Sequence, residues 1–181
     1  MHPLARLGLG LVLLVGLLTA VSLALPKNIT VARSQVINAH EADIFPYLND
    51  YRKFNEWSPW AARDPRTVYG FSGPAQGKGA RMSWQSDNPE VGSGSQEIIE
   101  SKPNSYLKVA LDFAGQGGGI ADFTLAPSGA GTRVTWGFSI DIGNNPMMRW
   151  MGLMFDRWVG GDYEAGLSRL AELVERKRSS R

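Results

Sequence analysis

The sequence contains no cysteine and two histidines, His2 and His40, in 181 residues. Without cysteine, the chain can form no disulfide, no thiolate nucleophile and no zinc site with cysteine ligands. His40 is the one base available to a histidine-dependent triad, and it lies just before an expected helix, where a capping or solvent-facing role fits better. No group of His, Asp and Glu has the spacing of metal ligands. We therefore expect no metal and no cofactor, and the catalytic residues stay unassigned.

The excess of positive over negative residues is also small. The formal net charge is +2, which is too small to favour nucleic acid as a partner. The one basic cluster comprises Arg176 and the tail at 177–181, after the last predicted helix. We expect this tail to be a solvated helix end, with contact to anionic lipid headgroups as the alternative.

The longest apolar run has no charged residue from Leu7 to Leu25. A helix of this length spans about 28 Å, close to the hydrocarbon thickness of a bilayer. The run therefore predicts a transmembrane helix, with residues 1–26 as an N-terminal anchor. A cleaved signal peptide is the alternative, but the run is longer than the usual apolar region of such a peptide. We expect a single-pass membrane protein whose following domain lies on the periplasmic or extracytoplasmic side.

The remaining sequence, residues 27–176, is typical of one folded domain. A strand is predicted at 29–38 from its β-branched residues, followed by two short helices at 40–50 and 51–57. Six more strands are predicted between glycine-rich turns, at 67–72, 80–85, 94–101, 106–113, 120–126 and 132–142. Such short turns favour antiparallel pairing, because parallel strands need crossovers of a dozen or more residues. The fold class is therefore α+β with a seven-stranded antiparallel sheet.

A long amphipathic helix is predicted at 146–176. Its apolar residues recur at three- and four-residue steps, the period of a helix that buries one face. Asn145 can cap its first turn, and Pro146 suits the first helical position. Gly160 and Gly161 lie in its middle, where each glycine costs about 1 kcal/mol relative to alanine. We expect the close approach of another backbone, or a kink, at these glycines.

Several motifs occur at particular places in this order of elements. The most specific are Trp57-Ser58-Pro59-Trp60, Asp64-Pro65 and the segment from Gly160 to Leu167, supported by Arg33, Ile37, Phe45, Asn49-Asp50 and Gly131-Thr132-Val134-Thr135-Trp136. Together they resemble the SRPBCC superfamily, which includes START domains and birch-pollen allergens, and most of all its polyketide cyclase/dehydrase branch. The resemblance covers about residues 28–174. It implies a helix-grip fold, in which the sheet wraps around the long C-terminal helix and the two short helices follow the first strand.

In such relatives the space between sheet and helix holds an apolar ligand. The side chains expected to line this cavity are large aromatic and methionine residues, although each could instead be ordinary core: Trp57, Trp60, Met82, Trp84, Phe113, Phe123, Trp136, Phe138, Met151, Met154, Phe155 and Trp158. The excess of tryptophan and methionine favours a site over a packed core, because methionine adapts to irregular partners. The resemblance therefore implies a membrane-anchored domain that binds a hydrophobic small molecule, either a lipid or a polyketide-like compound.

Two other functions stay open. The first is an enzyme of the cyclase/dehydrase type, which shapes a reactive polyketone and promotes loss of water. It would need inward-facing polar groups, for which Tyr69, Arg81, Asp122 and Tyr163 are the candidates. The second is a non-catalytic envelope interaction protein whose cavity is filled by its own side chains.

Overall fold

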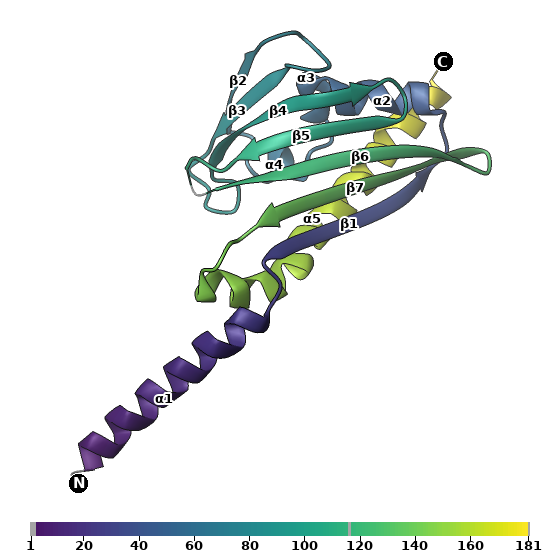
Figure 1. The fold of residues 1–181 in the computed structure, drawn as a ribbon. Coiled ribbons are helices and arrows are strands. Elements are labelled where there is room, and N and C mark those ends of the chain that lie inside the picture. The colour runs from purple at the N-terminus through teal and green to yellow at the C-terminus, as the bar shows by residue number, and fades with distance from the viewer. Residues whose placement is uncertain (1–2, 116, 181) are drawn as a thin grey trace.

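The computed structural model describes residues 3–115 and 117–180, with side chains from residue 8 onward. The elements follow in the order α1 (Pro3–Ala24), β1 (Asn28–Ile37), α2 (Glu41–Asn49), α3 (Tyr51–Phe54), α4 (Pro59–Arg63), β2 (Val68–Ser72), β3 (Arg81–Gln85), β4 (Ser93–Lys102), β5 (Tyr106–Asp112), β6 (Gly118–Ser128), β7 (Gly131–Asp141) and α5 (Pro146–Ser179). Figure 1 shows α1 projecting away from the sheet and α5 lying across the β1–β7 end of it.

The seven strands form one antiparallel sheet in the order β1-β7-β6-β5-β4-β3-β2. Consecutive strands from β2 to β7 pair through short turns, and β1 closes the order by pairing with β7 from Asn28 opposite Asp141 to Ile37 opposite Thr132. The predicted α+β class, the sheet and the long C-terminal helix are therefore confirmed. Helix α5 continues to Ser179, so Lys177 and Arg178 belong to its last turn rather than to a separate tail.

Three short helices follow β1 in the described chain, where the sequence predicted two. The Ser58-Pro59 pair was expected to end the second helix, but it begins a third one. Ser58 accepts a hydrogen bond from the amide of Ala61, and Pro59 occupies the first turn of α4, where no amide donor is needed. The same two residues thus separate α3 from α4.

Among the residues that the structure describes, no helix is both long enough and apolar enough to cross a membrane. The transmembrane helix expected from the first 26 residues is therefore not supported.

Helix α1 is joined to the start of α5 by the side chains of Arg149 and Trp150. The Arg149 guanidinium is 6% exposed and donates to the carbonyl oxygens of Ser22 (3.2 Å) and Leu23 (2.8 Å) at the end of α1. The Trp150 indole N–H donates to the carbonyl of Leu18 at 3.3 Å. Ser22 and Leu23 lie in the last turn of α1, where carbonyl groups lack intrahelical partners, whereas the Leu18 carbonyl lies in the helix interior. Arg149 therefore caps α1 and fixes it against α5.

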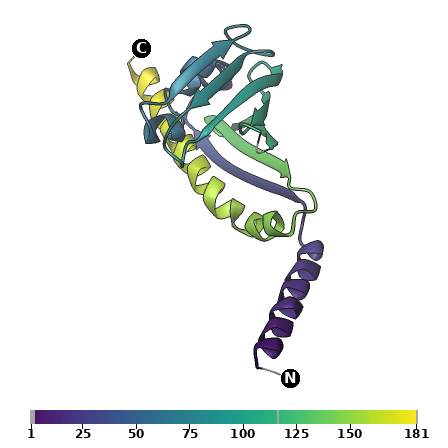
Figure 2. The same cartoon turned by 90° about the vertical axis from the view of Figure 1, so that its left-hand side faces the viewer.

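Helix α5 begins as predicted and rests on β1. The Asn145 side chain accepts from the amides of Met147 and Met148, with Pro146 in the first turn. Figure 2 shows that the helix curves along its length. Gly160 lies under the Arg33 guanidinium, where a Cβ would clash, so the expected close approach is made by a side chain rather than a backbone.

Arg33 holds the middle of α5 to the sheet through charge-assisted hydrogen bonds. Its guanidinium donates to the carboxylate of Asp156 at 2.9 Å and to that of Glu164 at 2.6 Å. The two acidic residues lie two turns apart on α5, so one strand residue grips both sides of the Gly160 contact.

Gly166 sets how closely α5 approaches the sheet. A Cβ at Gly166 would lie 2.8 Å from the Trp136 ring and 3.2 Å from Pro59, whereas a Cβ at Gly161 would meet nothing within 4 Å. We expect Gly166→Ala to lower the free energy of unfolding by about 1–3 kcal/mol, because a packed ring must move. The matched control Gly161→Ala should raise it by up to about 1 kcal/mol through helix propensity. Urea denaturation followed by circular dichroism measures both, and equal effects would contradict the tight contact.

Candidate functional site: an aromatic cluster under helix α5

The structure divides the twelve predicted cavity residues into three groups. Trp57, Met82, Phe123, Trp136 and Phe138 are buried in the core; Trp60, Trp84, Phe113 and Phe155 are partly buried against it; Met151, Met154 and Trp158 are 40%, 46% and 49% exposed. Nine of the twelve therefore lie in or on one hydrophobic core. The last three lie on the open surface of α5.

The centre of this core is an aromatic cluster, defined here as Trp57, Trp60, Phe123, Trp136 and Tyr163. Trp136 on β7 stacks face to face with Tyr163 of α5, with ring centroids 3.8 Å apart and planes at 11°. Phe123 of β6 stacks on Trp136 at 5.0 Å. Trp57 and Trp60 contact the same ring edge-on, at 5.4 and 5.8 Å. Sheet, short helices and α5 thus meet at one indole ring.

Two aromatic members of this region were missed as lining residues. Tyr163 was named only as a possible polar group, although its position with Gly166, Leu167 and Leu170 follows the spacing of one helix face. Phe54 was not named, and its ring lies 4.7 Å from that of Trp57. The helical spacing could have identified Tyr163, whereas Phe54 lies on a four-residue helix too short to show a period.

The indole N–H of Trp136 is buried and forms no hydrogen bond of good geometry, although it lies close enough to the stacked Tyr163 hydroxyl to lower the pKa of that group slightly against the effect of burial. The neighbouring Trp57 shows the ordinary arrangement, because its indole N–H donates to the carbonyl of Tyr47 at 2.9 Å. A buried donor without an acceptor costs about 1–3 kcal/mol, so native proteins rarely keep one without a purpose or a bound partner. The cluster therefore offers an apolar surface with one free donor, which suits a ligand that carries an acceptor oxygen.

Tyr163 and Tyr51 add buried hydroxyl groups that stay neutral. Burial raises the pKa of Tyr163 and that of Tyr51 well above the usual range of tyrosine. Each hydroxyl can therefore donate a hydrogen bond at any physiological pH. The Tyr51 hydroxyl, like the Trp136 indole, forms no hydrogen bond of good geometry.

The other polar candidates do not face this cluster. Asp122 lies between the buried Ala121 and Phe123, so strand alternation turns it to the opposite face of the sheet. Burial raises the pKa of its carboxyl group. Arg81 alternates with the buried Met82 in the same way and forms an ion pair with Glu97 at 2.9 Å. Arg81 and Asp122 are therefore removed as candidates for the inward-facing polar groups that an enzyme would need, and Tyr69 and Tyr163 remain.

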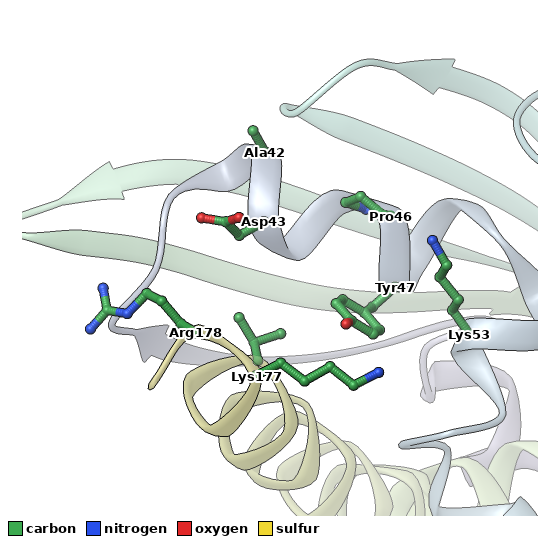
Figure 3. Close-up of a pocket in the computed structure, with 8 residues that line it drawn as sticks. Ala42, Asp43, Pro46, Tyr47, Lys53, Lys177 and Arg178 are labelled. Carbon is green, nitrogen blue, oxygen red and sulfur yellow. The ribbon is translucent and has the colours of Figure 1, made fainter. Parts of the chain in front are cut away.

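Three hollows of the surface lie away from the aromatic cluster. One of about 130 Å³ lies between α2 and the last turns of α5, where Lys53, Tyr47 and Lys177 surround it (Figure 3). One of about 140 Å³ adjoins Tyr51 and the β2–β3 turn. The largest, an open depression of about 510 Å³, is lined by residues of β2 to β5 and by no helix. Of the twelve predicted residues, Met82 alone lines any of these three, so the predicted cavity residues stay a prediction.

In the described part of the chain, no group of three or more His, Asp or Glu residues could hold a metal ion.

A family model described as "Polyketide cyclase / dehydrase and lipid transport" matches residues 28–175. Among solved structures, protein MLL2253 from Mesorhizobium loti is 20% identical with a TM-score of 0.57, covering 81% of this chain and 97% of that one. The KanY protein is 17% identical with a TM-score of 0.60, covering 82% and 98%. The di-domain ARO/CYC StfQ from the steffimycin biosynthetic pathway is 12% identical with a TM-score of 0.62, covering 85% of this chain and 52% of that protein. These likenesses concern the fold, and no curated protein matches the chain.

Asp64 fastens α4, and with it Trp60, to the end of β3. Its carboxylate is 5% exposed and accepts from the Ser86 hydroxyl at 2.5 Å and from the Arg66 amide at 3.0 Å. These two hydrogen bonds lower the pKa of the Asp64 carboxyl group. The stability that they supply is thus present above the ordinary carboxyl pKa of about 3.9 and is lost as pH falls through the lower, folded-state value.

We therefore expect Asp64→Asn to lower the thermal midpoint at pH 7 and to lose this effect in acid. Midpoints of the native chain and the variant should converge as pH drops below about 4. The control is Asp87→Asn, because Asp87 is exposed and directly follows Ser86 in the chain. It should change the thermal midpoint little at either pH. A difference that persists unchanged at low pH would show that the carboxylate charge is not what fastens α4.

Proposed function

Because the chain belongs to the polyketide cyclase / dehydrase and lipid transport family, we propose that it binds an apolar, carbonyl-bearing small molecule against the aromatic cluster. The ligand class is polyketide-like or lipid. The observation that carries this proposal is the unpaired, buried indole N–H of Trp136 among stacked rings. Binding without chemistry is the simplest function that these features support.

The chemistry of the cluster favours flat or unsaturated ligands over simple chains. Stacked and edge-on aromatic contacts gain about 0.5–1.5 kcal/mol each beyond the burial of their area. A carbonyl oxygen placed at Trp136 would accept from an N–H that the neighbouring Tyr163 hydroxyl does not satisfy with good geometry. Trp60 of the cluster is only partly buried, and so are Trp84, Phe113 and Phe155, which pack against the same hydrophobic core, so a ligand can still reach these side chains.

Entry of a ligand requires rearrangement of these partly buried rings. Trp136 and Tyr163 are buried, and Trp136 is covered on one face by Phe123 and on the other by Tyr163. Trp60 is the ring beside this pair that belongs to a five-residue helix, α4, rather than to the sheet. We place the opening at α4, because a helix of five residues can move without breaking the strand pairing of the sheet.

A cyclase or dehydrase activity is the second candidate. One observation favours it: the buried Tyr163 hydroxyl stays protonated, and its ring is stacked on Trp136. A neutral hydroxyl next to an indole N–H could polarise a substrate carbonyl and so promote enolisation and loss of water. This candidate requires turnover to depend on Tyr163, whereas simple binding does not.

The test uses anthraquinone, a flat diketone, and anthracene, the matched hydrocarbon without oxygen. We expect Trp136→Phe to weaken anthraquinone binding by about 5- to 30-fold, the loss of one buried hydrogen bond of about 1–2 kcal/mol, and to leave anthracene binding unchanged. Trp150→Phe, which makes the same change on the surface of α5, is the control. Titration followed by quenching of intrinsic fluorescence measures the affinity of the native chain and of each variant for both probes.

Two outcomes would overturn the proposal. Equal losses for both probes would mean that the ring, and not the N–H group, matters. An absence of binding for either probe, and of any copurifying apolar species in native mass spectrometry, would favour an interaction protein with a filled core. Tyr163→Phe separates the second candidate, because it should abolish turnover of a polyketone while leaving the anthraquinone affinity within about two-fold.

A further inference from the structure

Helix α1 exposes apolar side chains on every side. Its large exposed residues are Leu9, Leu11, Val12, Leu13, Leu14, Val15, Leu17, Leu18, Val21 and Leu23. The five consecutive residues from Leu11 to Val15 are 52–67% exposed, and five consecutive positions point around the whole helix axis. A helix that is apolar all round is ordinarily surrounded by apolar material. A single flat or grooved partner could cover one side of α1 and would leave the others in water.

The first half of α5 carries a second exposed apolar face. Met147, Met151, Met154 and Trp158 are 72%, 40%, 46% and 49% exposed and recur at steps of four, three and four residues, which places them in one stripe. The opposite side of the helix is the one that packs, because Gly152 faces Ile29 and Ile142. The sequence pattern assigned Met151, Met154 and Trp158 to a cavity lining, and in the structure their side chains lie on the exposed surface of α5.

Hydrogen bonds between α5 and α1 fix the two apolar surfaces relative to each other. The Arg149 guanidinium donates hydrogen bonds to the carbonyl oxygens of Ser22 and Leu23 at the end of α1. It also donates to Gly143 and Asn144 in the turn before α5. Trp150 adds a bond to Leu18, one turn further into α1. The start of α5 lies beside the end of α1, as Figures 1 and 2 both show. The stripe, which begins at Met147, is therefore held in a fixed relation to α1.

We propose that this joint surface binds a phospholipid bilayer, with the side chains of α1 among the acyl chains and the stripe on α5 at the boundary with the headgroups. Lipid is the occupant that can contact α1 on all sides at once. The α5 stripe has the composition of such a boundary, since tryptophan places an apolar ring and a polar N–H across it and methionine adapts to a fluid surface. The exposed Lys27 and Arg157, next to the two apolar surfaces, suit anionic headgroups.

The absence of cysteine makes a site-specific test possible in the full chain. Met151→Cys carries one environment-sensitive fluorophore on the α5 stripe, and Glu172→Cys carries the same label on an exposed position near the far end of that helix. Each labelled protein is mixed with vesicles of phosphatidylcholine and phosphatidylglycerol, with and without phosphatidylcholine that bears a doxyl quencher on its acyl chain. Thermal unfolding of each labelled protein confirms that it is folded.

With vesicles, we expect the emission of the Met151→Cys label to shift to the blue and to fall about two-fold when the doxyl lipid is present, because the label enters the acyl region. The Glu172→Cys label should show neither change. Quenching at both positions, or at neither, would overturn the proposal. A blue shift at the α5 stripe that needs no lipid and grows with protein concentration would identify a second copy of the chain as the occupant instead.

Discussion

The contact between Trp136 and Tyr163 joins the two halves of this fold. Tyr163 can reach the sheet because Gly166, one turn further along α5, has no side chain between the helix and the same indole ring. Phe123 and Trp57 complete the packing around that ring, so strands β6 and β7 and the short helices after β1 all depend on where α5 lies. From this point towards its N-terminus the helix is held by Arg33, then by the packing of Gly152 against Ile29 and Ile142, and at its start by the hydrogen bonds of Arg149. The two halves of α5 therefore differ: the C-terminal half packs on the aromatic cluster, whereas the N-terminal half leaves one apolar face exposed.

The strand order could be predicted because the sheet is antiparallel and its turns are short. Alternation along β5 and β7 is clear in the sequence, and the register follows from it. The three helices after β1 were harder, since Ser58-Pro59 suits both the end of one helix and the start of another. The period of α5 indicated an apolar face, but periodicity does not say what covers a face. Its first half therefore resembled cavity lining, whereas in the structure the side chains of Met151 and Met154 are exposed.

The candidate site could likewise be predicted only in part from the sequence. Asp122 lies between Ala121 and Phe123, so strand alternation, if applied to this strand, would have removed Asp122 as a candidate. The unpaired donor of Trp136 could not be predicted, because a missing partner depends on every group around the ring. Trp57 and Trp136 look alike in the sequence, and only one of them finds a carbonyl oxygen. Their difference comes from tertiary packing, which a local pattern does not contain.

The pairing of β1 with β7 has a consequence for how the chain folds. Asn28 and Asp141 are neighbours in the sheet but lie at opposite ends of the domain's sequence, and α5, which rests on β1, is made last. During synthesis the first strand must wait, unpaired, until nearly the whole polypeptide has left the ribosome. The hairpins from β2 to β7 can form before then, because each joins adjacent segments. Completion of the domain is thus a late, non-local step, and a chain that stops short of residue 131 would leave β1 as an open edge able to pair with other chains.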